Sequence, residues 1–232
     1  MSPGIAVTHS LMRRAIGAAR RIFRQHVLRD SFEREMGRWR AADGDRTLRM
    51  RYPLTADSTV WDLGGYHGDF AAEMRQRYSC GVRLFEPVPK LCDLCVKRFA
   101  ADPVVICLPY GLGVADGEFD ISDDADASSF VRGAGHGGTI KARIRPVPEV
   151  WRELGTRQVD LMKINIEGGE YDVLASLLDS GLIANVAHLQ VQFHNFVADP
   201  TARRDALRSR LRATHEEEWC YPFVWESWRR RP

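Results

Sequence analysis

Long apolar segments are missing from this sequence. None of its 232 residues belongs to an apolar run of about 18 residues, the minimum for a transmembrane helix. No apolar stretch near Met1 is long enough for the core of a secretory signal peptide. The sequence therefore predicts a protein without a membrane span, and we expect it in the cytoplasm.

Cysteine is scarce, and its count of 5 is odd. In a chain without an export signal, this favours reduced thiols over disulfides. Cys92 and Cys95 have the C-x-x-C spacing of redox and zinc motifs, but they lie within the helical pattern of Leu91, Leu94 and Phe99, and no second ligand pair at zinc spacing exists. We expect these cysteines to be buried structural thiols.

The sequence also lacks G-x-G-x-x-G, the fingerprint with which dinucleotide folds approach a pyrophosphate. Instead, an apolar run ends at Asp62, a turn with Gly64, Gly65 and Gly68 follows, and a second apolar run ends at Glu86, 22 residues after Gly64. This order predicts a nucleoside-binding α/β unit in which Glu86 accepts hydrogen bonds from ribose hydroxyls. Asp62 would repel a pyrophosphate, but it suits a ligand with a cationic amino group, such as the methionine part of S-adenosylmethionine.

Strand-like and helix-like patterns alternate along most of the chain. Apolar runs predict strands at 60–63, 82–85, 104–108, 159–164 and 187–193, helical spacing predicts helices between them and over 201–213, and a final strand pair is predicted at 219–228. This alternation predicts a mostly parallel sheet with right-handed crossovers and flanking helices. We expect one α/β domain over residues 52–232, preceded by an N-terminal helical extension over residues 1–51.

Positive charge is concentrated in that extension. Residues 1–51 contain 12 Arg and 5 acidic residues, about +7, which leaves 21 basic and 26 acidic residues, about −5, in the remainder. Arginines alternate with apolar residues such as Leu11, Ile16 and Phe23, so we expect amphipathic helices whose apolar side packs on the domain or on a second subunit of a homodimer. Contact with a membrane surface through the arginines is the alternative.

Residues 114–146 interrupt the alternating pattern. They contain Asp123, Asp124, Asp126 and four glycines between 133 and 138. A polar, glycine-rich stretch of this length is too long for an ordinary connection. We predict an active-site loop in which residues 123–138 cover the bound cofactor or acceptor.

Polar residues follow the predicted strands at their carboxyl ends, where open α/β sheets bind ligands. Glu167 lies in a second glycine turn that opens a helix, and His194 closes the fifth strand. The candidates for a general base are His194, Glu167 and His215, in that order, with His194 acting as a neutral imidazole. Glu170 is interpreted first as favourable charge at a helix N-terminus, and His67, in the first glycine turn, is a further candidate for ligand contact.

Four segments together resemble the FkbM family of S-adenosylmethionine-dependent methyltransferases: 60–68, 84–89, 127–130 and 163–170. The resemblance covers roughly residues 55–195. Its most specific segment is Lys163-Ile-Asn-Ile-Glu-Gly-Gly-Glu170, where family members typically have Asp in place of Asn165. The family implies a Rossmann-like class I methyltransferase fold with a mostly parallel seven-stranded sheet, and methylation of hydroxyls, often on sugars or polyketides.

The resemblance and the strand ends together place the cofactor. The residues expected to bind S-adenosylmethionine are Asp62, Gly64, Gly65, Tyr66, Gly68, Glu86, Pro87, Gly111, Leu112, Ser129 and Asn165. A divalent ion such as Mg²⁺, held by Glu167, Asn165 and His194, is an open alternative to a general base.

The resulting functional hypothesis is O-methylation of a sugar or of a glycosylated natural product. N-methylation of an aminosugar is an alternative, because an amine acceptor needs a base only to keep it neutral. A dinucleotide-dependent oxidoreductase is disfavoured by Asp62 and by the missing fingerprint. No base-stacking aromatic motif or base pocket favours a nucleic-acid substrate, and a non-enzymatic binding module would leave Asp62 and Glu86 without a purpose.

Overall fold

The computed structural model describes residues 31–122 and 139–232. Its centre is a seven-stranded sheet with the order β3-β2-β1-β7-β8-β10-β9. The strands are β1 (Thr59–Leu63), β2 (Gly81–Phe85), β3 (Val105–Leu108), β7 (Val159–Ile164), β8 (Val186–Val191), β9 (His215–Tyr221) and β10 (Trp225–Arg230). The first five are parallel, and β10 and β9 add an antiparallel hairpin. The mostly parallel seven-stranded sheet is confirmed.

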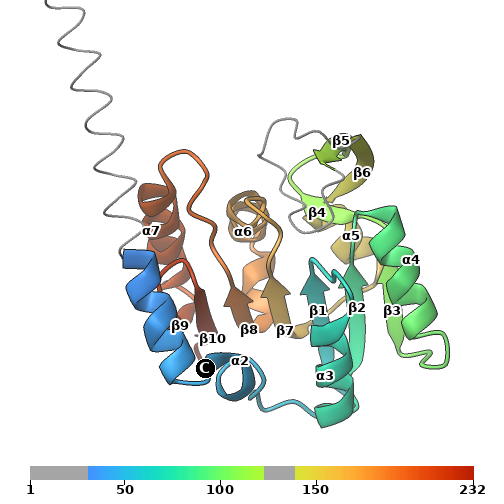
Figure 1. Cartoon of the computed structure of the whole chain (residues 1–232), viewed down its shortest axis with the longest axis horizontal. Helices are drawn as coiled ribbons and strands as arrows, with labels where there is room; N and C mark the ends of the chain where they lie inside the picture. The colour runs from blue at the N-terminus through green and yellow to red at the C-terminus, as the bar shows by residue number, and fades with distance from the viewer. Residues whose placement is uncertain (1–30, 123–138) are drawn as a thin grey trace, which may run out of the picture.

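Helices cover both faces of this sheet (Figure 1). α3 (Asp69–Tyr78) and α4 (Pro89–Arg98) lie on one face, whose core includes Val60, Val82 and Met74. α5 (Val147–Glu153), α6 (Glu170–Asp179), the short 3-10 helix η1 (Leu182–Asn185) and α7 (Pro200–Leu211) contribute to the core of the other face. Two fully packed cores explain why the strands are near-continuous apolar runs rather than alternating ones.

The N-terminal part of the description consists of a helix over residues 31–41 and the short α2 (Gly44–Thr47). Trp39, 2% exposed, packs with Val224 and Trp225 from the β9–β10 hairpin, so this segment is attached to the sheet. Leu11, Ile16 and Phe23, on which the predicted docking of the extension depends, lie outside the described residues. Within the described ranges, no helix has both the length and the apolar character that crossing a bilayer requires.

A second, three-stranded sheet replaces part of the predicted loop at 114–146. β4 (Gly111–Gly113), β5 (Gly117–Ser122) and β6 (Thr139–Pro146) form it in the order β4-β6-β5. The prediction of a continuous loop was therefore wrong at both of its ends, because β5 and β6 pair antiparallel over residues 117–122 and 139–144. Residues 123–138, where cofactor-coupled closure was predicted, lie outside the description.

Candidate active site

The site lies where the sheet reverses its winding, between the adjacent strands β1 and β7. The helix after β1 packs on one face and the helix after β7 packs on the other. Such a switch point opens a crevice outside the carboxyl ends of the strands, and open α/β sheets bind their ligands there. Asp62 and Lys163 are register partners at this point, so the chain brings both predicted glycine turns to one crevice.

The first glycine turn needs its glycines. Gly64 has a φ of 81°, and a Cβ atom added there would lie 2.0 Å from the carbonyl oxygen of Asn165. Gly68 has a φ of 79° and would meet the Phe99 ring at 2.8 Å. Tyr66, between them, holds a side chain at a φ of 50°, a left-handed conformation that costs free energy outside glycine. The turn therefore passes close to the second turn and leaves no room for side chains at Gly64.

Glu86 closes the opposite side of this turn. Its Oε2 accepts a hydrogen bond from Tyr66 N at 2.8 Å, and its Oε1 accepts one from Val88 N at 2.9 Å. Burial raises the pKa of the Glu86 carboxyl, although these two amides and Lys163 act in the opposite direction. Each carboxylate oxygen can accept a further hydrogen bond, so Glu86 suits the ribose role that the sequence predicts.

Asp62 does not present a free charge to the crevice. Lys163 Nζ donates to Asp62 Oδ1 at 2.9 Å, and also to the carbonyl oxygens of Leu63 at 3.2 Å and Gly64 at 2.6 Å. Both side chains are buried, at 0% and 4% exposure for Asp62 and Lys163. The sequence interpretation, that Asp62 suits a ligand with a cationic amino group, did not anticipate this ion pair.

Two buried acceptors at the crevice nevertheless lack hydrogen-bond partners in the described structure. They are Asp62 Oδ2, at the end of β1, and Asn165 Oδ1, just after β7. A buried acceptor without a donor costs about 1–3 kcal/mol. An ammonium group, as in the methionine part of S-adenosylmethionine, supplies the missing donors, so the residues present fit this cofactor.

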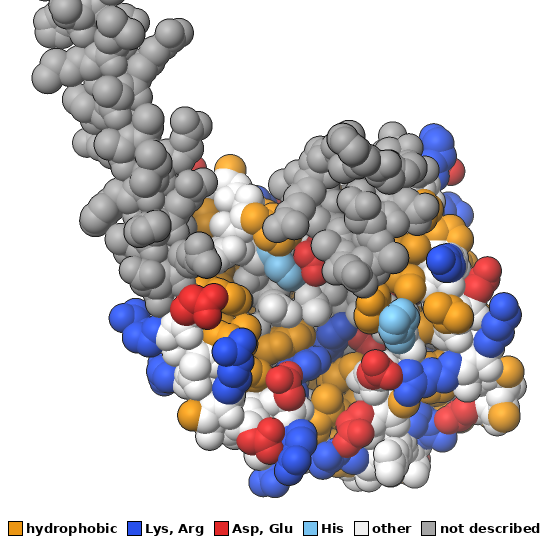
Figure 2. All heavy atoms as spheres, viewed as in Figure 1, with side chains coloured by type: hydrophobic (Ala, Val, Ile, Leu, Met, Phe, Trp, Pro, Cys, Tyr) orange, Lys and Arg blue, Asp and Glu red, His pale blue; other side chains and the backbone are white. Residues whose placement is uncertain are grey.

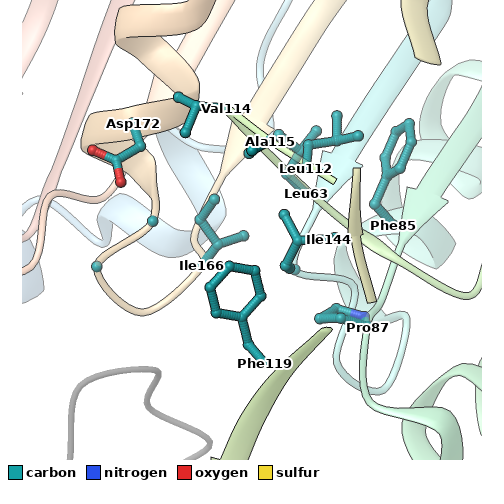
Figure 3. Close-up of a pocket in the computed structure, with 15 residues that line it drawn as sticks. Leu63, Phe85, Pro87, Leu112, Val114, Ala115, Phe119, Ile144, Ile166 and Asp172 are labelled. Atoms are coloured by element: carbon teal, nitrogen blue, oxygen red, sulfur yellow. The ribbon is translucent and has the colours of Figure 1, made fainter. Parts of the chain in front are cut away.

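A cavity of about 270 Å³ continues from the crevice (Figure 3). Apolar side chains from three elements point into it, including Phe119 of β5, Ile144 of β6 and Ile166 of the second glycine turn. Four residues that the sequence assigned to the cofactor also line it: Gly64, Pro87, Gly111 and Leu112. An apolar cavity beside a ribose acceptor suits a flat heteroaromatic ring such as adenine.

The second glycine turn brings two carboxylates to one histidine. His194 Nδ1 lies 3.1 Å from Glu170 Oε1, and His194 Nε2 lies 3.5 Å from Glu167 Oε1. Glu167 adopts a left-handed φ of 52°, and its side chain is 36% exposed. On the face of the molecule drawn in Figure 2, few histidine side chains are visible, and acidic side chains are scattered among basic ones.

The pKa of His194 decides which of these groups accepts a proton. Burial disfavours the imidazolium, but hydrogen bonds and charge attraction from Glu167 and Glu170 outweigh it and raise the pKa to about 9. At neutral pH, His194 is therefore a cation that donates from both ring nitrogens. A raised pKa disfavours the neutral imidazole that the sequence interpretation assumed for His194, and it leaves Glu167 as the candidate for a general base.

The other predicted residues have different locations. His215 is fully buried and lies 2.9 Å from the carbonyl oxygen of Val186, the first residue of β8. It therefore lies at the amino ends of the parallel strands, the edge opposite the crevice, where β9 pairs with β10 through His215 and Arg230. The strand pattern in the sequence does not reveal which end of the sheet this residue occupies. Ser129 lies outside the described residues, and His67 stacks on Tyr66 with ring centroids 3.9 Å apart.

The sequence leaves open a divalent ion held by Glu167, Asn165 and His194. No cluster of three or more His, Cys, Asp or Glu side chains suited to a metal ion occurs in residues 31–122 and 139–232. Both nitrogens of His194 face carboxylates. The cysteines in this part of the chain are free thiols, and Cys92 and Cys95 are buried.

Sequence reasoning missed the roles of Lys163 and Glu170. Lys163 neutralises a carboxylate 101 residues away, a contact that no local pattern reveals. Glu170 did give a signal, because its spacing of three residues from Glu167 across a glycine turn allows both carboxylates to face one partner. Its complete burial distinguishes it from an ordinary charge at a helix N-terminus.

Comparison with solved structures concerns the fold of the chain. The chain matches a crystal structure titled as methyltransferase FkbM from Methylobacillus flagellatus KT with a TM-score of 0.52 and 12% identity, covering 78% of this chain and 45% of that one. The chain thus spans less than half of that protein, and the likeness concerns the fold. An rRNA methylase from Streptococcus thermophilus matches with a TM-score of 0.43 and 8% identity, over 77% of this chain and 90% of that one.

None of the curated proteins matches the chain significantly. The model of the methyltransferase FkbM domain matches residues 62–213, from the end of β1 to just past α7. This range includes both glycine turns, Glu86 and the Glu167–His194–Glu170 group, and it exceeds half of the chain. The chain therefore belongs to the FkbM family of S-adenosylmethionine-dependent methyltransferases.

Proposed function

We propose that this chain transfers a methyl group from S-adenosylmethionine to a hydroxyl of a sugar or of a glycosylated natural product. The observation that supports the proposal most directly is the pairing of Glu167 with a protonated His194 beside the crevice. This pair offers a partly exposed carboxylate held in place by a cation. A hydroxyl acceptor needs such a group because it must lose its proton as the new C–O bond forms.

Different residues of the crevice bind different parts of the cofactor. Glu86 and the first glycine turn hold the nucleoside, and the apolar cavity holds the ring. When bound there, S-adenosylmethionine supplies an electrophilic methyl group. Fixing the acceptor oxygen in line with that group contributes about 7–11 kcal/mol to the lowering of the barrier.

Glu167 acts on the acceptor. Its carboxylate accepts the hydroxyl proton as the oxygen forms its bond to the methyl carbon, and its exposure lets that proton pass to water afterwards. A general base of this kind contributes roughly 10²–10⁴-fold. The His194 imidazolium donates to Glu167 and keeps it directed at the acceptor, and it does not itself take the proton.

An amine acceptor is the second candidate. The group of Glu167, Glu170 and protonated His194 sums to one negative charge, and the nearby Lys163 is already paired with Asp62. Negative charge attracts an ammonium group, and Glu167 can take its proton to give the nucleophilic amine. N-methylation of an aminosugar would use the same residues.

Calorimetry tests the cofactor. We expect S-adenosylmethionine and S-adenosylhomocysteine to bind and NAD not to bind under the same conditions. Binding of NAD with neither sulfur ligand would contradict the proposal and favour an oxidoreductase.

Mass spectrometry tests the acceptor. A set of methyl glycosides, a set of aminosugars and a short rRNA hairpin are incubated separately with the protein and S-adenosylmethionine, and we expect a gain of one methyl group on a glycoside hydroxyl. Glu167→Gln should reduce this turnover by about 10²-fold or more while S-adenosylhomocysteine still binds. Methylation of the hairpin alone would overturn the proposed acceptor class.

A further inference from the structure

Glu170 connects the two members of the proposed proton-accepting pair. Its Oε1 accepts from the backbone N of His194 at 2.7 Å and lies 3.1 Å from Nδ1 of the same residue. Its Oε2 accepts from the backbone N of Gly168 at 2.8 Å, next to Glu167 in the second glycine turn. One carboxylate therefore fixes both the histidine and the turn that presents Glu167.

A helix-terminal charge does not need this arrangement. Glu170 is the first residue of α6, where a carboxylate in solvent would already interact favourably with the helix dipole. Here the side chain is 0% exposed, and burying a carboxylate is costly unless its hydrogen bonds are supplied by the protein. Two of the three hydrogen-bonding groups belong to His194, so the buried carboxylate serves the histidine rather than the helix alone.

We propose that Glu170 is a positioning residue of the methyl-transfer site, which clamps His194 so that its Nε2–H stays directed at Glu167. The inference rests on the proposed function for its catalytic consequence, but the clamp itself is testable without an acceptor. Glu170 does not touch the acceptor or the cofactor; it acts through His194.

Glu167 and Glu170 are the charged groups that contact the His194 ring, as its other neighbours show. From α6, Tyr171 donates its hydroxyl to the carbonyl oxygen of His194 at 2.8 Å, which fixes the backbone but not the ring. Phe196 packs on the ring with centroids 5.1 Å apart. From α7, Arg203 pairs with Asp172 at 2.9 Å and Arg204 pairs with Glu226 at 2.6 Å, so both cations are engaged by carboxylates other than Glu167 and Glu170.

Removing the Glu170 charge has a defined consequence for the ring. Both carboxylates raise the pKa of His194, so a neutral residue at 170 leaves burial opposed by Glu167 alone. The imidazolium should then lose its proton at a lower pH. A neutral imidazole carries only one N–H, so it cannot donate to Glu167 from Nε2 and to residue 170 from Nδ1 at the same time. The pair of Glu167 and His194 then loses its fixed geometry.

The test is a nitrogen NMR titration of the histidine rings in the full chain, with His194→Gln used to assign the signal. We expect the ring of His194 to titrate near pH 9 in the unaltered chain and at least one pH unit lower in Glu170→Gln. Asp179→Asn, at an exposed carboxylate on the same helix, is the matched control and should leave the titration unchanged. An unchanged titration in Glu170→Gln would overturn the clamp.

Turnover provides the second measurement. On a glycoside that the unaltered chain methylates, Glu170→Gln should lower kcat by about tenfold or more, move the pH profile in the same direction as the NMR titration, and leave the affinity for S-adenosylhomocysteine within about twofold. In the His194→Gln background, Glu170→Gln should have almost no further effect on kcat, because the imidazole ring that Glu170 positions is already absent. Equal losses in both backgrounds would overturn the positioning role.

Failure of the clamp and failure of the proposed function give different results. If no glycoside is methylated by the unaltered chain, the proposed function fails, while the NMR titration still decides the clamp. If Glu170→Gln does not fold, Glu170→Asp keeps the charge on a shorter side chain, and the His194 titration should then fall below that of the unaltered chain. An Asp variant with the original titration and full turnover would contradict a role that depends on this geometry.

Discussion

At the scale of single residues, Glu86 tests the nucleoside half of the site. Glu86→Gln keeps the shape of the side chain but removes the charge that we expect to accept ribose hydroxyls. We expect calorimetry to show a loss of about 1–3 kcal/mol in S-adenosylhomocysteine binding, or roughly 5- to 150-fold in affinity. Glu73→Gln, on the neighbouring helix α3 and paired with Arg77, is the control and should bind normally. Equal affinity in the two variants would remove Glu86 from the ribose site.

His194 gives a second prediction, on stability. Its pKa in the folded chain, about 9, lies above its ordinary value of 6.5. A raised pKa means that its contribution is fully present below pH 6.5 and is lost as pH rises through 9, up to about 3 kcal/mol in all. Urea unfolding should therefore show that the unaltered chain loses more stability between pH 6.5 and 9.5 than His194→Gln does.

The control for this prediction is His67→Gln, which replaces an exposed histidine. Only the difference between the chains is interpreted, because other groups also titrate in this range of pH. A His194→Gln chain whose stability follows the same pH dependence as the unaltered chain would show that the imidazolium is not held by Glu167 and Glu170.

At the scale of elements, the first glycine turn is held in place by contact with the second. Gly64→Ala must adopt a left-handed backbone and also displace the Asn165 carbonyl, 2.0 Å from the new Cβ. We expect urea unfolding to show a loss of at least about 2 kcal/mol, together with weaker S-adenosylhomocysteine binding. Gly155→Ala has a comparable φ of 59° with nothing within 4 Å, and should cost only about 1 kcal/mol. Equal costs would mean that the two turns can separate freely.

Elements with a strong apolar pattern were predictable from the sequence. The runs at 60–63 and 82–85 became β1 and β2, and the spacing of Phe70, Met74 and Tyr78 became α3. The small sheet was missed although β5 and β6 alternate polar and apolar residues, because the glycines between them dominated the interpretation of the segment. α5 was missed because Pro146 and Pro148 indicate a loop, whereas proline is also favourable at the start of a helix.

The candidate site was predictable to the same degree and for the same reason. Strand ends and glycine turns are local signals, so the sequence singles out Glu86, Glu167 and His194 as candidates. Their chemistry depends on partners that the fold brings together over long distances in the sequence: Lys163 reaches Asp62 across 101 residues, and Glu170 reaches His194 across 24. The raised pKa of His194 results from its contacts with Glu167 and Glu170, and it cannot be deduced from the residue's position at a strand end.

At the scale of the whole molecule, the crevice joins the two packed faces of the sheet. Asp62 and Lys163 connect β1 to β7, and the turns beyond them belong to α3 on one face and α6 on the other. A ligand that bridges the two turns should therefore stabilise the entire fold, since it binds the folded chain and not the unfolded one.

Thermal unfolding measures this coupling. At 100 times its Kd, S-adenosylhomocysteine should stabilise the fold by about 2.7 kcal/mol. For a domain of this size that corresponds to a rise in Tm of roughly 5–10 °C. NAD at the same concentration should leave Tm unchanged, because the turn after β1 lacks the glycine spacing that a pyrophosphate needs. The rise should be smaller in Glu86→Gln and normal in Glu73→Gln. A rise with NAD, or a rise that Glu86→Gln leaves intact, would place the nucleoside elsewhere than in the crevice between β1 and β7.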